Sequence, residues 1–266
     1  MKNTQIISVI NQKGGVGKTT TVINLATALS FQKKKILIID LDPQGNATTG
    51  FGIRNNDDTK TIYDVLNGSS SFEDTIKDTK IDNLKLVTSN VDLSGLEIET
   101  ANENRRAFLL KDKIENFVNS SRNDFSYIFI DCPPSLSLLT VMSLVVANSL
   151  IVPLQAEFFA LEGLTQLMKT IDRVKIKLNP KLKIRGILIT MFDKRNKLSA
   201  QVDAEARKFL NEKVYHTVIP RNVRLSEAPS HGIPVLIYDK LCAGSKSYFN
   251  FAEEFLDQEN IMESAA

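Results

Sequence analysis

The stretch that decides the fold spans residues 13–20 and reads Lys13-Gly14-Gly15-Val16-Gly17-Lys18-Thr19-Thr20. A short apolar run at residues 6–10 precedes it, and an amphipathic pattern over residues 19–31 follows it. This order predicts a buried strand, a glycine-rich turn and a helix. Glycines let successive backbone N–H groups turn inward without a Cβ clash, and the N-terminus of the following helix favours an anion at the same place. The stretch is therefore expected to bind the phosphates of a nucleotide.

Different residues of this loop are expected to contact different parts of ATP and its Mg²⁺ ion. Lys18 would reach the β- and γ-phosphates, and the Thr19 hydroxyl would ligate Mg²⁺. The standard pattern G-x-x-x-x-G-K-[ST] has Gln12 in place of its first glycine, and Lys13 enters the loop instead. A second lysine beside the phosphates supplies positive charge to a phosphoryl transition state. We therefore predict that residues 13–20 bind ATP and that Lys13 and Lys18 are catalytic.

Two acidic segments follow apolar runs that are expected to be strands of the same sheet. Residues 40–46 read Asp-Leu-Asp-Pro-Gln-Gly-Asn after the run at residues 36–39, and Asp131 follows the run at residues 127–130. A carboxylate at the end of such a strand positions a water for in-line attack or holds the hydration shell of Mg²⁺. An acidic residue in the position of Asp131 bonds Mg²⁺ directly or through water. Asp42 is therefore predicted to be catalytic, and Thr19 and Asp131 are predicted metal ligands.

The rest of the chain continues the alternation of apolar runs and longer amphipathic patterns. Further strands are predicted at residues 84–87, 150–152, 184–190 and 214–219, and helices at residues 94–119, 138–147, 161–178, 200–210 and 247–256. Apolar strands separated by helices predict a doubly wound α/β fold, with a mostly parallel sheet and helices on both faces. Ligands bind such sheets at the carboxyl ends of the strands. We expect one P-loop domain over residues 1–256 and a frayed polar tail at 257–266.

Composition narrows the class of protein. The chain has 266 residues, is 42% hydrophobic and carries a formal net charge of +2, so affinity for nucleic acid must come from local patches. Two cysteines fit a reducing cytosol better than a disulfide framework. No signal peptide is visible. The uncharged segment 132–156 is interrupted by prolines and polar residues, which favours a buried helix and strand over a membrane span.

Four further segments carry a resemblance to a known family. They are the acidic segment at residues 40–46, Ile-Asp-Cys-Pro-Pro-Ser-Leu at 130–136, Pro-Leu-Gln-Ala-Glu at 153–157 and Ile-Pro-Arg-Asn-Val-Arg-Leu-Ser-Glu-Ala-Pro-Ser at 219–230. With the lysine-rich loop, these segments resemble the ParA/Soj family of the ParA/MinD superfamily, the P-loop NTPases with a deviant Walker A motif, over residues 5–248. The resemblance implies an ATP-bound sandwich dimer in which Lys13 reaches the partner's nucleotide. It also implies that Asp42 is needed for hydrolysis and that Pro220 and Asn222 lie against the adenine.

The resemblance further implies what the protein binds. Members of this family segregate chromosomes and plasmids, and their ATP-bound dimers bind double-stranded DNA without sequence preference. A ParB/Spo0J-type protein bound at centromere-like sites stimulates hydrolysis and releases the DNA. The protein is thus expected to be cytoplasmic and nucleoid-associated. By resemblance, basic residues of two loops and the segment after them form the DNA surface: Arg195, Arg221, Arg224 and Lys246. The basic stretch at 169–185 is interpreted as a solvated helix face.

Other ATPases of the same superfamily are the alternatives. A membrane-associated positioning ATPase similar to MinD needs a basic amphipathic helix at its C-terminus, whereas residues 251–259 are acidic, so no membrane partner is predicted. A redox ATPase similar to the nitrogenase iron protein needs a suitably placed cysteine pair, which Cys132 and Cys242 do not form. A capsule-type tyrosine kinase needs a C-terminal tyrosine cluster, where only Tyr238 and Tyr248 are found. The first strand begins near the start of the chain, which argues against an N-terminal operator-binding domain.

Overall fold

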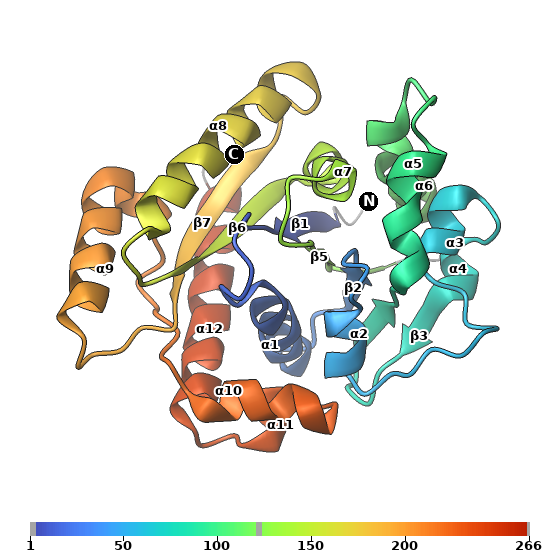
Figure 1. Ribbon diagram of the computed structural model, residues 1–266. Helices are drawn as coiled ribbons and strands as arrows, with labels where there is room; N and C mark the ends of the chain where they lie inside the picture. The colour runs from blue at the N-terminus through green and yellow to red at the C-terminus, as the bar shows by residue number, and fades with distance from the viewer. Residues whose placement is uncertain (1–3, 121–123, 265–266) are drawn as a thin grey trace.

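A computed structural model describes residues 4–120 and 124–264. Within these ranges seven strands form one sheet in the order β3-β4-β2-β5-β1-β6-β7 (Figure 1). The strands are β1 Gln5–Val9, β2 Ile36–Asp40, β3 Ile76–Asp78, β4 Leu84–Val87, β5 Tyr127–Asp131, β6 Ser149–Gln155 and β7 Lys183–Thr190. Only the edge strand β3 is antiparallel to its neighbour. The predicted doubly wound, mostly parallel α/β fold is confirmed.

Helices pack on both faces of this sheet (Figure 1). The α-helices are α1 Lys18–Phe31, α2 Asn46–Gly50, α3 Ile62–Asn67, α4 Phe72–Thr75, α5 Leu96–Glu99, α6 Leu109–Asn119, α7 Leu138–Val146, α8 Ala160–Lys177, α9 Lys197–Leu210, α10 Val223–Glu227, α11 Val235–Tyr238 and α12 Ala243–Ser264. Short 3₁₀ turns are η1 Val91–Gly95, η2 Arg106–Phe108, η3 Asn211–Lys213 and η4 Ala228–His231. No helix of the described residues combines the length and apolarity that crossing a membrane requires.

Alternation along the strands divides the core into two layers. In β2, Ile36 and Ile38 belong to the apolar layer shared with α1 and α12, whereas Leu37 and Ile39 belong to the layer shared with α6, α7 and α8. Successive strand side chains point to opposite faces, so a strand covered on both sides is apolar throughout. This is why β2 is fully buried.

The strand register places the predicted site residues at one edge of the sheet. Asp131 of β5 lies opposite Val9 of β1 and opposite Asp40 of β2. The glycine-rich loop therefore leaves β1 directly beside the acidic ends of β2 and β5. All three belong to the carboxyl edge, where parallel α/β sheets bind their ligands.

The prediction of a strand at residues 214–219 is wrong. This segment makes only isolated bridges, Ile187 with Val214 and Phe192 with Pro220. The backbone N–H groups of residues 216 and 217 donate to the Glu254 carboxylate of α12, at 2.6 and 2.8 Å. Because these donors turn toward a side chain, the segment follows the edge of β7 without forming a regular ladder.

The single helix predicted at residues 94–119 is also wrong, since the chain forms η1, α5, η2 and α6 there. Asn102 and Asn104 lie in the interruption, and asparagine favours turns over helix interiors. The polar tail expected from residue 257 is helical as far as Ser264, because α12 continues through it. The Tyr127 hydroxyl donates to Glu259, which ties this part of α12 to β5.

Candidate functional site

The loop between β1 and α1 has the backbone that an anion-binding turn requires. Gly15 and Gly17 have φ of 75° and 90°, in the left-handed region that side chains disfavour. A Cβ added at Gly15 would meet nothing within 4 Å, so the backbone conformation, and not lack of space, demands glycine there. Gly17 is the N-cap of α1. Residues 14–20, apart from Val16, line a cavity of about 350 Å³ that also contacts Asp42 and Pro134.

Lys18 is held inside this site. Its side chain is buried, and Nζ donates to the backbone oxygen of Lys13 at 3.1 Å. Burial lowers the pKa of Lys18, while the negative charge of Asp131 acts in the opposite direction. A partly desolvated ammonium group attracts phosphate oxygens strongly, because few water molecules screen its charge.

Two carboxylates at the end of β2 have different surroundings. Asp40 accepts hydrogen bonds from the backbone N–H and the hydroxyl of Thr48, at 2.8 and 2.7 Å. Its burial is complete and raises its pKa to about 6. Asp42 is also buried, but among the described residues its Oδ1 accepts only the backbone N–H of Gln44, at 3.0 Å. Asp40 thus fixes α2 through Thr48, and Asp42 is the one that lines the cavity.

Asp131 is fully buried, and neither of its carboxylate oxygens has a well-formed hydrogen bond to a described residue. Burial first, and then the charge of Asp40, raises the pKa of Asp131 well above its ordinary value, although the nearby Thr19 hydroxyl acts in the opposite direction. Two buried acceptors without well-formed hydrogen bonds are costly in protein, and a cation would satisfy them. No three His, Cys, Asp or Glu side chains group to hold a metal within the described ranges. That fits Mg²⁺, which takes one or two carboxylates together with substrate phosphates.

Lys13 lies apart from the other predicted catalytic groups. Its ammonium forms an ion pair with Glu157, and the side chain is 51% exposed. Its backbone N–H donates to Asn11 Oδ1 at 3.0 Å, which fixes the start of the loop. Lys13 does not line the phosphate cavity of its own chain. The structure thus brings Lys18, Thr19 and Asp42 together on one cavity and leaves the Lys13 side chain beside it.

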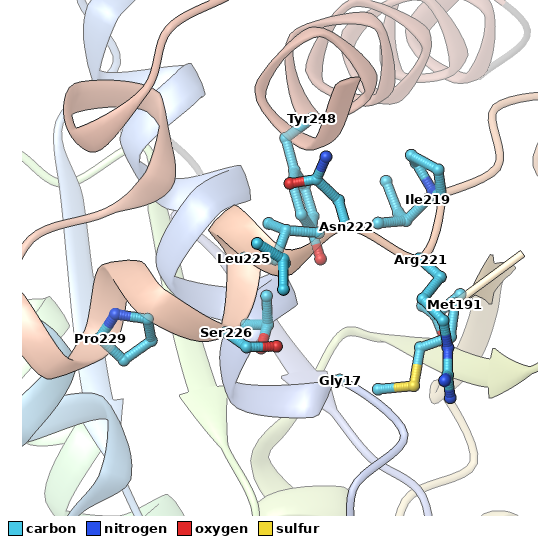
Figure 2. A pocket seen from close by; sticks show the side chains of 13 residues that line it. Gly17, Met191, Ile219, Arg221, Asn222, Leu225, Ser226, Pro229 and Tyr248 are labelled. Carbon is cyan, nitrogen blue, oxygen red and sulfur yellow. The ribbon is translucent and has the colours of Figure 1, made fainter. Parts of the chain in front are cut away.

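A cavity of about 510 Å³ adjoins the loop and contains the residues predicted to contact adenine. Figure 2 shows side chains of the C-terminal segment, among them Asn222, Leu225 and Tyr248, gathered on one side and Gly17 and Met191 on the other. Asn222 Oδ1 caps α10 by accepting the backbone N–H of residue 224 at 3.0 Å. The lining also includes Pro220, Ile219 and Pro229.

Sequence reasoning missed several residues of this pocket. Met191 follows β7 with φ of 51°, a position that the carboxyl-edge rule could have indicated. The Tyr248 hydroxyl lies 3.1 Å from the Thr21 hydroxyl, which joins α12 to α1 across 227 residues of sequence. No local pattern marks such a contact.

The four predicted DNA-contacting residues differ in whether an acidic side chain pairs with them. Phe192 bridges Pro220, and the Arg221 N–H donates to the Phe192 oxygen at 3.0 Å, so their two loops are side by side. Arg195 is paired with Asp193 through two hydrogen bonds, which hold the pKa of Asp193 at about 2.

Arg224 is also paired, with Glu227 at 2.8 Å and with Asp239 at 3.4 Å. Arg221 and Lys246 are exposed, and neither forms an ion pair with a described residue. Arg221 and Lys246 are therefore the two predicted DNA-contacting residues whose charge no described carboxylate neutralises.

Comparison with known proteins matches most of the chain. A family model described as an AAA domain matches residues 4–184. The chromosome partitioning protein ParA of Caulobacter vibrioides is 49% identical over 262 residues, covering 98% of this chain and 97% of that protein. The sporulation initiation inhibitor protein Soj of Bacillus subtilis is 46% identical over 250 residues, covering 94% and 97%.

A solved structure also matches over nearly the full length. Cobyrinic acid a,c-diamide synthase from Mycobacterium smegmatis, with bound ADP and magnesium, has a TM-score of 0.84 and 32% identity, covering 97% of this chain and 96% of that one. The matches to ParA and Soj thus extend over nearly the whole chain at an identity near one half. The chain belongs to the ParA/Soj family of chromosome-partitioning ATPases.

Proposed function

We propose that this partitioning ATPase hydrolyses ATP to ADP and phosphate with Mg²⁺, and that ATP switches it into a DNA-binding dimer. The observation that supports this most is Asp131, a buried carboxylate without a well-formed hydrogen bond to a described residue, next to Lys18 at the carboxyl edge. A magnesium ion with nucleotide phosphates accounts for both groups. The related structure with ADP and magnesium supports the same pair of cofactors.

Each residue of the cavity then has a chemical role. The backbone N–H groups of residues 14–20 and the Lys18 ammonium bind the β- and γ-phosphates. Thr19 and Asp131 would hold Mg²⁺, which neutralises phosphate charge when bound. Asp42 orients the attacking water: the bond from water oxygen to γ-phosphorus forms, and the bond from that phosphorus to the β,γ-bridging oxygen breaks. One proton of the water stays on the released phosphate, and the other passes to the solvent. Pro220 and Asn222 contact the adenine.

Lys13 is proposed to act on the nucleotide of a second copy of the chain. Its ion pair with Glu157 is partly exposed, with side chains 51% and 29% accessible. Pairs of this kind contribute only ~0–1 kcal/mol, so exchanging Glu157 for a partner's phosphate is energetically easy. Because Lys13 does not line the phosphate cavity of its own chain, it can contact the nucleotide of a second copy without giving up a contact to its own nucleotide.

The ATP-bound dimer is proposed to bind double-stranded DNA through phosphate contacts. Arg221 and Lys246 carry the available charge, and Arg195 and Arg224 join only if their acidic partners release them. A ParB/Spo0J-type protein would stimulate hydrolysis and so release the DNA. The site of action would be the nucleoid, in the cytoplasm. The acidic C-terminal segment of α12 gives no support to the MinD-like alternative.

Sizing chromatography with light scattering, run without nucleotide, with ADP and with ATP, tests this function. We expect a dimer only with ATP. Lys13→Ala should keep ATP affinity and lose the dimer, whereas Lys18→Ala should lose ATP binding itself because the phosphates lose their buried counter-ion. Lys213→Ala, an exposed lysine in η3, is the control. An ATP-dependent dimer of normal strength in Lys13→Ala would rule out the cross-dimer role.

A further inference from the structure

A further cavity, of about 860 Å³, adjoins the nucleotide site without belonging to it. Thr49 of α2 and Pro229 of η4 line both this cavity and the phosphate cavity, so they form the boundary between them. The other walls come from residues 43–45, 52–55 and 89–91, from Lys80, and from residues 230–232. Its volume is in the range of sites that hold small molecules of nucleotide size.

All ionisable residues that line this cavity are basic. They are Arg54, Lys80 and His231, and no aspartate or glutamate lines it. Arg54 and Lys80 are exposed, and neither forms an ion pair with a described residue, whereas Arg195 and Arg224 are both paired. His231 stacks on Tyr238 with ring centroids 4.9 Å apart, which fixes its position. A concave surface with basic residues of one sign attracts anions.

The neutral part of the wall is short of hydrogen-bond partners. Ser89 is buried and its Oγ has none among the described residues, and the same holds for Oδ1 of Asn55. The amide nitrogen of Asn55, Nδ2, donates to the Ser89 backbone oxygen at 2.8 Å and so joins the two residues. Buried polar atoms without partners indicate a wall whose hydrogen bonding is incomplete.

We propose that this cavity binds a small phosphate-bearing molecule of up to nucleotide size, distinct from the ATP of the phosphate loop. Arg54, Lys80 and His231 would contact its phosphate groups. Arginine and lysine recognise phosphate through charge-assisted hydrogen bonds. The neutral groups available to the rest of the molecule are Asn55 Oδ1 and Ser89 Oγ, which have no hydrogen-bond partner among the described residues.

The walls of this cavity are mechanically joined to the ATP site. On one side, Thr48 of α2 bonds to Asp40, and the Ser89 N–H donates to the Thr48 hydroxyl at 3.2 Å. On the other side, Gly52 and Gly232 are in direct backbone contact, which holds η4 against the end of α2. An anion that contacts both Arg54 and His231 would tighten this contact. Because Pro229 also lines the phosphate cavity, the anion should slow the exchange of bound nucleotide.

Titration calorimetry tests the site on the full chain saturated with ADP and Mg²⁺, so that the phosphate loop is filled. The probes are uridine 5′-monophosphate, inorganic phosphate and uridine. We expect the monophosphate to bind one per chain and uridine not to bind. Measurable binding of inorganic phosphate would show that the anion alone is recognised, and its absence that the nucleoside contributes. The double variant Arg54→Ala/Lys80→Ala should weaken binding at least ~10-fold, since two charge-assisted contacts are lost.

The matched control is Lys77→Ala/Lys85→Ala, which removes the same charge from the neighbouring strands β3 and β4 outside the cavity. It should bind the monophosphate as the parent does. Absence of binding, or equal weakening in both double variants, would overturn the site. Coupling is read separately, as the rate at which a fluorescent ADP analogue dissociates with and without the monophosphate. An unchanged rate in the parent protein would overturn the coupling and leave the binding result standing.

Discussion

Replacing Gly232 by alanine tests the contact between the end of α2 and η4 that forms a wall of the cavity of about 860 Å³. A Cβ at Gly232 would lie 2.5 Å from the Cα of Gly52 and 3.0 Å from its backbone nitrogen. Carbon atoms normally approach to 3.5–4.0 Å, about 1 Å farther apart. Both partners are backbone, so no side chain can rotate away. The two segments must separate, or one must change conformation.

Two costs add at this position. Gly232 has φ of 64°, and an L-residue in the left-handed region costs about 1–2 kcal/mol. Overpacking of a closed contact costs about 1–3 kcal/mol more. The expected loss in the free energy of unfolding is therefore about 2–5 kcal/mol, a large part of the stability of an ordinary domain.

Gly68 offers a matched control, because it has the same kind of backbone without the contact. Its φ is 85°, and the nearest atom to an added Cβ is the end of the flexible Lys113 side chain, 3.9 Å away. Gly68→Ala should therefore cost only the conformational part, about 1–2 kcal/mol. The difference between the two losses in the free energy of unfolding is therefore the cost of the steric clash at Gly232.

Equilibrium unfolding in urea, followed by circular dichroism, measures both variants. We expect Gly232→Ala to be less stable than Gly68→Ala by about 2 kcal/mol. Equal losses in the two variants would mean that the segments around residues 52 and 232 separate freely. The tight contact, and the coupling inferred from it, would then be refuted.

Three further results are expected. Asp42→Asn keeps an acceptor for the Gln44 N–H, so the variant should still bind ATP. Its rate of hydrolysis, measured by phosphate release, should fall about 100-fold or more. A loss of ATP affinity would instead make Asp42 a binding group. Arg221→Glu should weaken DNA binding on two unrelated duplexes more than Arg224→Glu does, because the charge of Arg224 is already neutralised by its acidic partners. Fluorescence anisotropy across a salt series measures both affinities, with ATP affinity as the control. The reverse order of the two variants would contradict this assignment. The pKa of Asp40 is about 6 in the fold and about 3.8 when unfolded, so its protonated form favours folding. Without Mg²⁺, the stability of Asp40→Asn relative to the parent should therefore rise by about 2 kcal/mol from pH 4 to pH 7, and a constant difference in urea unfolding would exclude this.

The sequence predicted best where function restricts local conformation. Residues 13–20 were predictable because only glycine tolerates the backbone of Gly15 and Gly17, and the flanking strand and helix are strongly patterned. The place of Asp131 at the carboxyl edge was predictable because it ends a buried apolar strand, whereas its role as a metal ligand stays a prediction. The lack of well-formed hydrogen bonds to Asp131 within the described residues was not predictable, since that depends on the whole environment.

Prediction failed where distant residues decide the local structure. The apolar run at 214–219 has the composition of a strand, but Glu254, far along the chain, takes two of its N–H groups. Tyr248 reaches the nucleotide pocket from α12 without a local motif. Arg195 and Arg224 were selected from the family resemblance and their place in two loops. That selection did not foresee the carboxylates that pair with them, Asp193 and Glu227.

The irregular segment beside β7 also bears on how copies of this chain meet. An edge strand with free N–H and C=O groups is a template on which another chain can add strands and aggregate. At β7 that template is occupied by residues 214–220, whose own donors are partly satisfied by Glu254. The opposite edge is β3, only three residues long and flanked by the ion pair of Lys85 with Asp78. Strand addition is thus disfavoured at both margins of the sheet, and the proposed ATP-dependent dimer would have to form through side-chain and nucleotide contacts instead.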